Sequence, residues 1–374
     1  MQFEKYPFEK LSELLADVQP NENFSPLSLT IGEPQFPTPK FIQEELANNA
    51  HLLNKYPKTA GEEELQRAVL DFVQRRFGIE LRNEELVLSF GTRELLFNFP
   101  QYLLANKQNP TMAFTNPFYQ IYEGAAIAAK ANVRYLDLTP QNGFKPQIDE
   151  SLKDTDLVIL NFPNNPTASV MEQSELEEWV RAALEYDFVL LNDECYSEIY
   201  IDEPVPSLLQ ASRAVGNEDF RNILVVNSIS KRSSAPGLRS GFIAGDAKIL
   251  REYRRYRTYV GCASPLPLQK AAAVAWSDEE HVIQNRDRYR TNFKLAKEIL
   301  GLPIPKATFY LWLEVGDDEA FAKEAYERYN LKVLPGSYLG RNGVGRGYVR
   351  VALVYPEAKM KEALERLKEA LDER

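Results

Sequence analysis

Lys231 is the residue whose type and surroundings point most strongly to chemistry. It lies in the segment Ser-Ile-Ser-Lys, just after an apolar run at 223–226, and Arg239 follows eight residues later in Pro-Gly-Leu-Arg. A lysine just past a buried strand is desolvated, which lowers its pKa and makes its amine a nucleophile that can form a Schiff base. Arg239 is a fixed cation for an anionic group, and Ser228 adds a hydroxyl. A solvated Lys-Arg pair is the usual interpretation of such a lysine, but the strand context favours the catalytic one.

Asp193 and Tyr196 form a second candidate group, directly after an apolar run at 188–191. A buried carboxylate needs a partner, and the protonated pyridine nitrogen of an electron-withdrawing cofactor would be one. The Tyr196 hydroxyl could donate to the phenolic oxygen of that cofactor. Asn165, in a turn marked by Asn-Pro pairs, offers an amide to the same atom. Taken alone, Asp193 could equally be a helix cap, and the turn could be a plain surface turn.

Gly91 and Thr92 stand between the apolar run 86–89 and a predicted helix. A glycine at a strand-to-helix turn exposes backbone N–H groups and the positive end of the helix dipole to an anion. Thr92 adds a hydroxyl. This signal is weak by itself, because many helix starts have the same pattern.

The apolar runs at 157–160, 188–191 and 223–226 predict the strands that position these residues. Continuous apolar runs of this length are typical of parallel strands covered by helices on both faces, and the segment 172–186 is long enough for such a helix. We therefore expect an α/β fold with a mostly parallel sheet. Ligands of such sheets bind at the carboxyl ends of the strands, where the candidate residues lie.

The chain is expected to divide after about residue 265, where a helix-rich region begins. Apolar runs at 309–313 and 348–354, with a last helix from Glu357, indicate a compact α+β unit. The expected parts are an N-terminal arm packing on the small domain, 1–35, a large cofactor-binding domain, 36–265, and a smaller C-terminal domain, 266–374.

Composition argues against several classes of protein. The 374 residues include 44 Lys and Arg against 54 Asp and Glu, a net charge of −10, which is unlike a nucleic-acid binder. Two cysteines and two histidines argue against a disulfide framework and against a metal site. We expect no metal, no nucleic-acid partner and no membrane partner, because neither a long apolar span nor a secretory signal is present. A cytoplasmic enzyme is the default expectation.

Taken together and in this order, the motifs resemble the fold-type-I pyridoxal-phosphate enzymes of the class I/II aminotransferase family, over essentially the whole chain. The resemblance implies that Lys231 carries pyridoxal 5'-phosphate as an internal aldimine and that Asp193 pairs with the pyridine nitrogen. It implies that Tyr196 and Asn165 bind the phenolic oxygen. The other implied cofactor contacts are Gly91, Thr92, Ser228 and Arg239 in the phosphate cradle, Arg93 beside it, Tyr119 stacked on the ring, and Tyr56 reaching the phosphate of the other subunit.

The same resemblance implies how substrate binds. Arg350, in Tyr-Val-Arg-Val, would grip the substrate α-carboxylate as a bidentate fork, with Asn165 beside it and Gly32 beneath it. The role of Tyr56 in the neighbouring site implies a homodimer. One departure is Ala168, which stands where the family usually has glycine after Asn-Pro-Thr. The glycine-rich stretch 340–347 is interpreted as a flexible loop that could cover the site.

Several segments are similar to the bacterial N-succinyldiaminopimelate aminotransferases of lysine and diaminopimelate biosynthesis. This similarity implies a ping-pong reaction between N-succinyl-LL-2,6-diaminopimelate and 2-oxoglutarate, with glutamate as the physiological donor. The substrate has two distal carboxylates, and we hypothesise that Arg232 or Arg257 binds them, although 251–257 could instead be a solvated helix face. The alternatives are a broad aspartate or aromatic aminotransferase, an LL-diaminopimelate aminotransferase, a carbon–sulfur lyase on the same scaffold, and a cofactor-sensing regulator domain.

Overall fold

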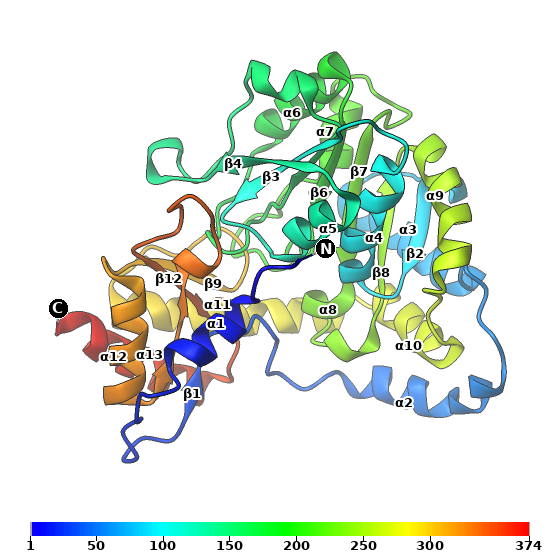
Figure 1. Cartoon of the computed structure of the whole chain (residues 1–374). Helices are drawn as coiled ribbons and strands as arrows, with labels where there is room; N and C mark the ends of the chain where they lie inside the picture. Colours follow the sequence, from blue (N-terminus) through cyan, green and yellow to red (C-terminus); the bar gives the residue numbers. More distant parts are fainter. Residues whose placement is uncertain (1, 374) are drawn as a thin grey trace.

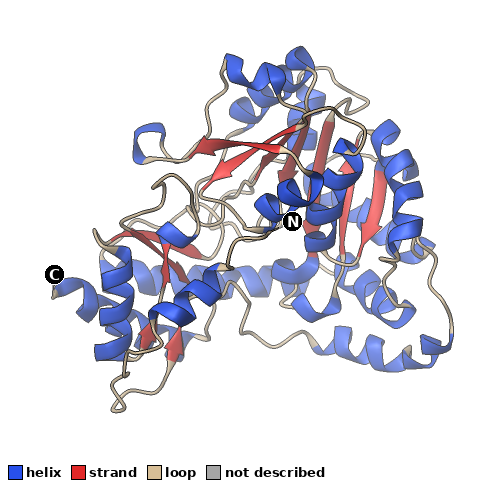
Figure 2. Ribbon diagram, in the orientation of Figure 1, coloured by secondary structure: helices blue, strands red, loops and turns tan. Residues whose placement is uncertain are grey.

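A seven-stranded sheet forms the centre of the large domain in the computed structural model, which describes residues 2–373 (Figures 1 and 2). All neighbouring strands are parallel except that β8 runs antiparallel to both of its neighbours. The predicted α/β fold with a mostly parallel sheet is confirmed. The strand order is β2 (Leu86–Ser89), β8 (Gly241–Gly245), β7 (Ile223–Ser228), β6 (Val189–Asp193), β5 (Leu157–Leu160), β3 (Thr111–Asn116) and β4 (Asn132–Asp137).

Helices cover both faces of this sheet. Successive strand residues point to opposite sides, so strands that are apolar at every residue present two apolar faces that must be buried. In β6, Leu190 belongs to the apolar core on one face and Leu191 to the core on the other. The first core is completed by α3 (Glu63–Phe77), α6 (Gln173–Tyr186), α7 (Leu208–Ala214) and α10 (Leu266–Ser277). The second is completed by α4 (Thr92–Leu104), α5 (Ile121–Ala129) and α9 (Ala247–Val260).

The small domain is an α+β unit with its own apolar core. Its antiparallel sheet has the order β11 (Leu334–Pro335), β12 (Tyr348–Ala352) and β9 (Tyr310–Glu314). The helices α12 (Asp318–Tyr329) and α13 (Glu357–Asp372) pack on it. The apolar runs at 309–313 and 348–354 thus correspond to its two longer strands.

The N-terminal arm lies against this small domain. Its helix α1 (Pro7–Leu14) places Leu11 in a small core with Leu334 and Leu339. Further along, β1 (Leu27–Ser28) pairs in parallel with β10 (Leu331–Lys332). The helix α2 (Lys40–Asn48) then leads to the large domain, where it packs on α10.

The change of domain lies later than residue 265. Helix α10 packs on α3, and its Trp276 is fully buried in the large-domain core. The next helix, α11 (Glu280–Leu300), contributes Phe293 and Ala296 to the small-domain core. The expected boundary therefore misplaces α10, and α11 is the element that spans the two domains. Within the described residues, no helix is both long enough and apolar enough to cross a membrane.

Candidate active site

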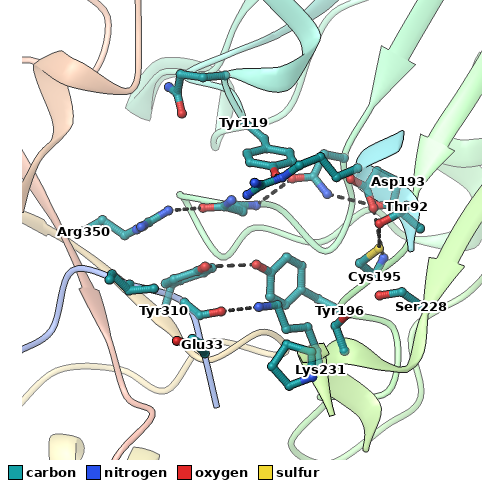
Figure 3. A pocket seen from close by; sticks show the side chains of 18 of the residues that line it. Glu33, Thr92, Tyr119, Asp193, Cys195, Tyr196, Ser228, Lys231, Tyr310 and Arg350 are labelled. Carbon is teal, nitrogen blue, oxygen red and sulfur yellow. Dashed lines mark hydrogen bonds between the residues drawn. The ribbon is translucent and has the colours of Figure 1, made fainter. Parts of the chain in front are cut away.

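A pocket of about 570 Å³ opens between the carboxyl ends of the central strands and the small domain (Figure 3). Most of the residues singled out from the sequence meet in its wall, although they come from separate parts of the chain. They are Gly32, Thr92, Arg93, Tyr119, Asn165, Asp193, Tyr196, Ser228, Lys231, Arg239 and Arg350. Gly91 adjoins this wall through Arg239.

Lys231 lies on α8 (Ile229–Arg232), a single helical turn that follows β7 directly. Its side chain points into the pocket, and its Nζ donates a hydrogen bond to the carbonyl of Gly32 (Figure 3). Burial lowers the pKa of Lys231 to about 8, and the positive charges of Arg350 and Arg93 act in the same direction. A lysine with this pKa exists partly as the free amine near neutral pH, as a nucleophile or a base requires.

Asp193 ends β6 with its side chain buried. One carboxylate oxygen accepts a hydrogen bond of 2.9 Å from the Tyr122 hydroxyl, and the other accepts one of 3.2 Å from the backbone N–H of Cys195. Burial raises the pKa of Asp193, and these two donors oppose the change. A cationic partner would compensate for the buried charge.

The start of α4 forms the anion-binding side of the pocket. Gly91 precedes the helix with φ +77°, and no side chain of the described residues caps the first helical turn, so its N–H groups remain available to an anion. A Cβ at position 91 would overlap the guanidinium of Arg239, so only glycine lets that cation approach the turn. Nη1 of Arg239 donates to the carbonyl of Pro236 at 2.6 Å, which fixes its direction.

Arg350 occupies the opposite side, on β12. Its Nη1 donates to Asn165 Oδ1 at 2.8 Å and its Nη2 to the Thr30 carbonyl at 2.5 Å. The guanidinium also lies 4.6 Å from the ring centre of Tyr310. Its Nε is buried and has no hydrogen-bond partner among the described residues. The two hydrogen bonds orient the fork, and an anion in the pocket could satisfy the charge.

Tyr196 and Tyr310 connect the two sides of the pocket. Their hydroxyl groups lie 2.9 Å apart, and both side chains are buried. A Cβ at Gly32 would overlap the Tyr310 ring, which explains why glycine stands at that position. On the outer side, Arg93 Nε donates to the Tyr119 hydroxyl at 2.7 Å.

Comparison with known proteins decides the family. A family model described as aminotransferase class I and II matches residues 25–367. The chain belongs to this family. It is 31% identical to an LL-diaminopimelate aminotransferase of Desulforudis audaxviator (strain MP104C), with 98% of this chain and 95% of that protein covered.

Solved structures support the same assignment. The chain resembles the aminotransferase AspB of Helicobacter pylori 26695, with 50% identity, a TM-score of 0.98 and 100% of both chains covered. It also resembles an aminotransferase of Neisseria meningitidis Z2491, with 39% identity, a TM-score of 0.94, and 99% and 98% of the two chains covered. The protein is therefore a transaminase that depends on pyridoxal phosphate, the cofactor of this family.

The residues of this aminotransferase suit the cofactor. The open N-terminus of α4 and the Arg239 guanidinium form a cradle for a phosphate, and a side chain at Gly91 would fill that cradle. The buried carboxylate of Asp193 offers a partner for a protonated ring nitrogen. Lys231, with its lowered pKa, can supply the amine that reacts with an aldehyde.

Two expected substrate contacts are not in the pocket of the aminotransferase. Arg232 is 1% exposed and binds the carbonyls of Ala275 and Asp278, at 2.7 and 3.1 Å, and the carboxylate of Glu279. Arg257 is also 1% exposed, and its Nη1 lies 2.7 Å from both carboxylate oxygens of Glu94. Neither guanidinium can reach a substrate without giving up these partners, so we withdraw both as binders of the distal carboxylates.

Tyr56 and the glycine-rich stretch 340–347 both lie outside the wall of the pocket. Tyr56 lies outside the pocket and is fully exposed, as a residue serving a neighbouring subunit would be in a single chain. The glycine-rich stretch 340–347 is anchored, because the Arg341 guanidinium pairs with Glu123 and its N–H donates to Asn116 Oδ1 at 2.8 Å. These contacts attach the start of the stretch to the large domain, and the covering role of the rest stays a prediction.

The sequence did not single out three residues that support the site, of which Glu33 and Tyr310 line the pocket and Tyr122 lies behind Asp193. Tyr122 binds Asp193 from α5, and Tyr310 binds Tyr196 from β9. The side chain of Glu33 lines the pocket near Lys231, and its charge raises the pKa of that lysine. Only Glu33 had a sequence signal, since it follows Gly32 directly. The two tyrosines look like ordinary core aromatic residues until the fold brings them to the site.

Proposed function

We propose that this aminotransferase transfers the amino group between N-succinyl-LL-2,6-diaminopimelate and 2-oxoglutarate, with Lys231 holding pyridoxal phosphate. The observation that carries the proposal is that two further cations, Arg350 and Arg93, line the pocket besides Lys231 and Arg239, which are assigned to the cofactor. Arg350 lies deep and can take the α-carboxylate that every amino-acid substrate shares. Arg93 is exposed on the outer side, and it forms no ion pair with any carboxylate of the described residues. A substrate with carboxylates at both ends matches this arrangement.

The residues of the chain divide the chemistry between them. Pyridoxal phosphate, when bound, supplies the electron withdrawal that makes the α-hydrogen of an amino acid acidic. Arg350 fixes the α-carboxylate, and Tyr119 closes one side of the pocket. The Lys231 amine can then take the proton from the α-carbon and return it elsewhere, because its pKa of about 8 allows both protonation states. The Asp193 carboxylate, at the carboxyl end of β6, can stabilise a positive charge on the cofactor ring.

A second candidate substrate is LL-diaminopimelate itself. The name of the Desulforudis audaxviator relative supports it. The pocket also holds Glu33, whose carboxylate could pair with a free distal ammonium group. The succinyl derivative lacks that ammonium group and would gain nothing from Glu33. Both candidates have a distal carboxylate that Arg93 could bind, and they differ at the distal amine, which only LL-diaminopimelate presents to Glu33 as an ammonium group.

The experiment is a coupled assay of the purified enzyme with 2-oxoglutarate as acceptor. N-Succinyl-LL-diaminopimelate, LL-diaminopimelate and aspartate are supplied in turn. We expect kcat/KM for the succinyl substrate to exceed the others by at least about a hundredfold, or about 2.7 kcal/mol of discrimination. A higher value for LL-diaminopimelate would replace the first candidate by the second. Comparable values for aspartate would indicate a broad aminotransferase, and pyruvate release from cystathionine would indicate a lyase.

We also propose that the enzyme is a homodimer. Seven large apolar residues are exposed among the described residues, and four of them lie in two short stretches of the large domain: Leu53 and Tyr56, with 74% and 101% of their surface accessible, and Tyr259 and Val260, with 88% and 41%. Leu53 lies in a short 3-10 helix, Ala50–Asn54, and Tyr56 follows it, while Tyr259 and Val260 are the last two residues of α9. A second copy of the chain would cover such residues and bring Tyr56 to a neighbouring pocket.

A further inference from the structure

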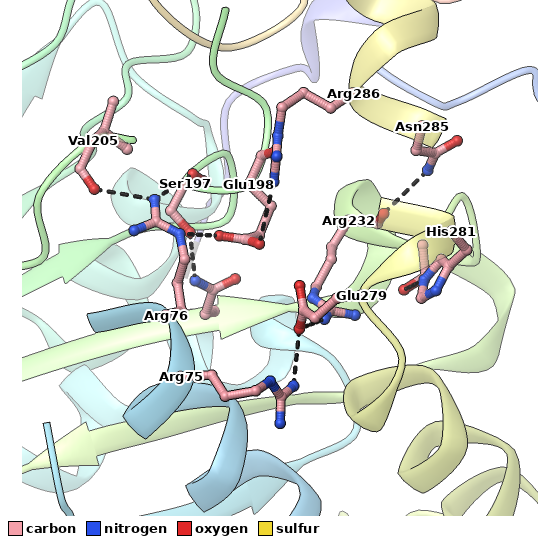
Figure 4. Close-up of polar contacts among 12 residues, drawn as sticks. Arg75, Arg76, Ser197, Glu198, Val205, Arg232, Glu279, His281, Asn285 and Arg286 are labelled. Carbon is pink, nitrogen blue, oxygen red and sulfur yellow. Dashed lines mark hydrogen bonds and ion pairs between the residues drawn. The ribbon is translucent and has the colours of Figure 1, made fainter. Parts of the chain in front are cut away.

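The helix that carries Lys231 cannot hold its own geometry. α8 comprises four residues, and a single helical turn makes too few internal hydrogen bonds to be stable alone. The position of the Lys231 amine therefore depends on the contacts of the residues beside it. The three residues that follow Lys231 all bind one region, the end of α10 and the start of α11 at 275–285. Figure 4 shows Arg232 beside two residues of this region, Glu279 and Asn285.

Arg232 makes the strongest of these attachments. Its guanidinium donates to two carbonyls at the end of α10 and to the carboxylate of Glu279 at 2.5 Å. It also lies 5.0 Å from the ring centre of Phe72 and 5.4 Å from that of Trp276. In return, the backbone carbonyl of Arg232 accepts a hydrogen bond of 3.1 Å from Asn285. The guanidinium and the backbone carbonyl of Arg232 are thus both hydrogen-bonded to the junction of α10 and α11.

Ser233 and Ser234 continue the attachment. The Ser233 hydroxyl lies 2.8 Å from His281 Nε2, and His281 Nδ1 lies 2.5 Å from the Asp278 carboxylate. This row has the order of a catalytic triad, but Ser233 is completely buried, so no substrate reaches its hydroxyl. Ser234 donates to Asn285 Oδ1 at 3.2 Å. The row holds the backbone after Lys231 and performs no chemistry of its own.

The same helix α11 also holds the loop after Asp193. Arg286 Nε donates to the backbone carbonyl of Glu198 at 3.0 Å. The carboxylate of Glu198 pairs with Arg76 at 2.6 Å, and Arg76 also binds the carbonyl of Ser197 at 3.1 Å (Figure 4). The segment that follows Lys231 and the loop that follows Asp193 are therefore both attached to α11.

We propose that Arg232 is a positioning residue for Lys231, which sets the place of the lysine amine by tying α8 to the junction of α10 and α11. The proposal rests on the proposed role of Lys231. Arg232 touches neither the pocket nor any group that reacts. Its effect must reach the site through the backbone of α8.

Arg75 provides a matched control. Its Nη2 donates to the carbonyl of Trp276 at 3.0 Å and to the same Glu279 oxygen at 2.8 Å (Figure 4). It therefore binds the same junction as Arg232, from α3, but makes no hydrogen bond or ion pair with α8 among the described residues. If the junction serves only stability, loss of either arginine should have the same kind of effect.

The experiment compares Arg232→Met, Arg232→Lys and Arg75→Met with the wild-type enzyme. Methionine keeps the apolar contact with the two rings and removes the hydrogen bonds. We expect Arg232→Met to lower kcat at least about tenfold, because small misplacement of a reacting group is costly, and to leave KM for glutamate within about twofold. Arg232→Lys should recover part of the loss. Arg75→Met should lower the thermal unfolding temperature and leave kcat unchanged.

A second readout uses the enzyme stripped of cofactor. The pKa of the Lys231 amine is measured from the pH dependence of its acetylation, followed by peptide mass. Burial holds this pKa at about 8 in the wild type, and a displaced amine becomes more solvated, so the value should rise towards 10.5 in Arg232→Met and stay unchanged in Arg75→Met. Unchanged kcat and lysine pKa in Arg232→Met, or equal losses of kcat in both methionine variants, would overturn the proposal.

Two further outcomes are decisive. If Arg232→Met does not fold, Ser233→Ala removes a single hydroxyl from the same attachment and should give a smaller fall in kcat with unchanged KM. Wild-type kcat in that variant would refute the positioning role. If borohydride fixes the cofactor of the wild-type enzyme on another lysine, the role of Lys231 fails first and the positioning proposal falls with it.

Discussion

Replacing Arg350 by glutamine tests how the enzyme recognises an amino acid. In the structure the guanidinium is held by Asn165 at 2.8 Å and by the Thr30 carbonyl at 2.5 Å, which leaves its fork directed at the pocket. Each hydrogen bond from such a cation to a carboxylate contributes about 1.5–3 kcal/mol. Loss of two such bonds therefore amounts to about 3–6 kcal/mol, or a fall of about 10² to 10⁴ in kcat/KM.

The assay compares glutamate with 4-aminobutyrate, which is glutamate without the α-carboxylate. Conversion of the bound cofactor is followed by absorbance in single-turnover experiments. The wild-type enzyme should prefer glutamate strongly, and Arg350→Gln should lose that preference because 4-aminobutyrate offers no α-carboxylate to bind. Arg350→Lys keeps the charge but not the fork and should fall between the two. If Arg350→Gln reacts more slowly with both compounds by the same factor, Arg350 does not read the carboxylate.

Three further predictions concern other parts of the chain. The rate of proton transfer should rise with pH and level off above about 8, because the Lys231 amine accepts a proton only when unprotonated; a pH-independent rate between 6 and 9 would contradict this. Ala168 is buried with φ +60°, a backbone conformation that strains any side chain and a β-branched one most. The free energy of unfolding in urea should therefore be at least about 2 kcal/mol lower for Ala168→Val than for Ala168→Gly, and equal values in the two variants would refute this backbone strain. Leu53→Asp should weaken the dimer in sedimentation measurements, whereas an unchanged mass would argue against this face as the interface.

The parts of the fold that the sequence predicts are those with a local signal. The runs at 157–160, 188–191 and 223–226 are apolar on every residue because these strands are buried on both faces, and they are β5, β6 and β7 of the sheet. The edge strand β4 is partly exposed, and β8 contains two glycines and runs antiparallel. Neither gives a comparable run, so neither was predicted.

The candidate site follows the same division. Lys231, Asp193 and Arg239 could be selected because each follows a recognisable segment of its own. The error with Arg232 and Arg257 has a physical cause: the partners that bury them, Glu279 and Glu94, are 47 and 163 residues away in sequence. A run of charges does not reveal whether its members face solvent or a distant carboxylate.

The most direct test of the account is to find which residue holds the cofactor. The enzyme is loaded with pyridoxal phosphate, reduced with borohydride, cleaved into peptides and analysed by mass spectrometry. The account predicts that the reduced cofactor is attached to Lys231 and that Lys231→Ala abolishes steady-state transamination. Attachment to a different lysine, or sustained transamination by Lys231→Ala, would contradict it.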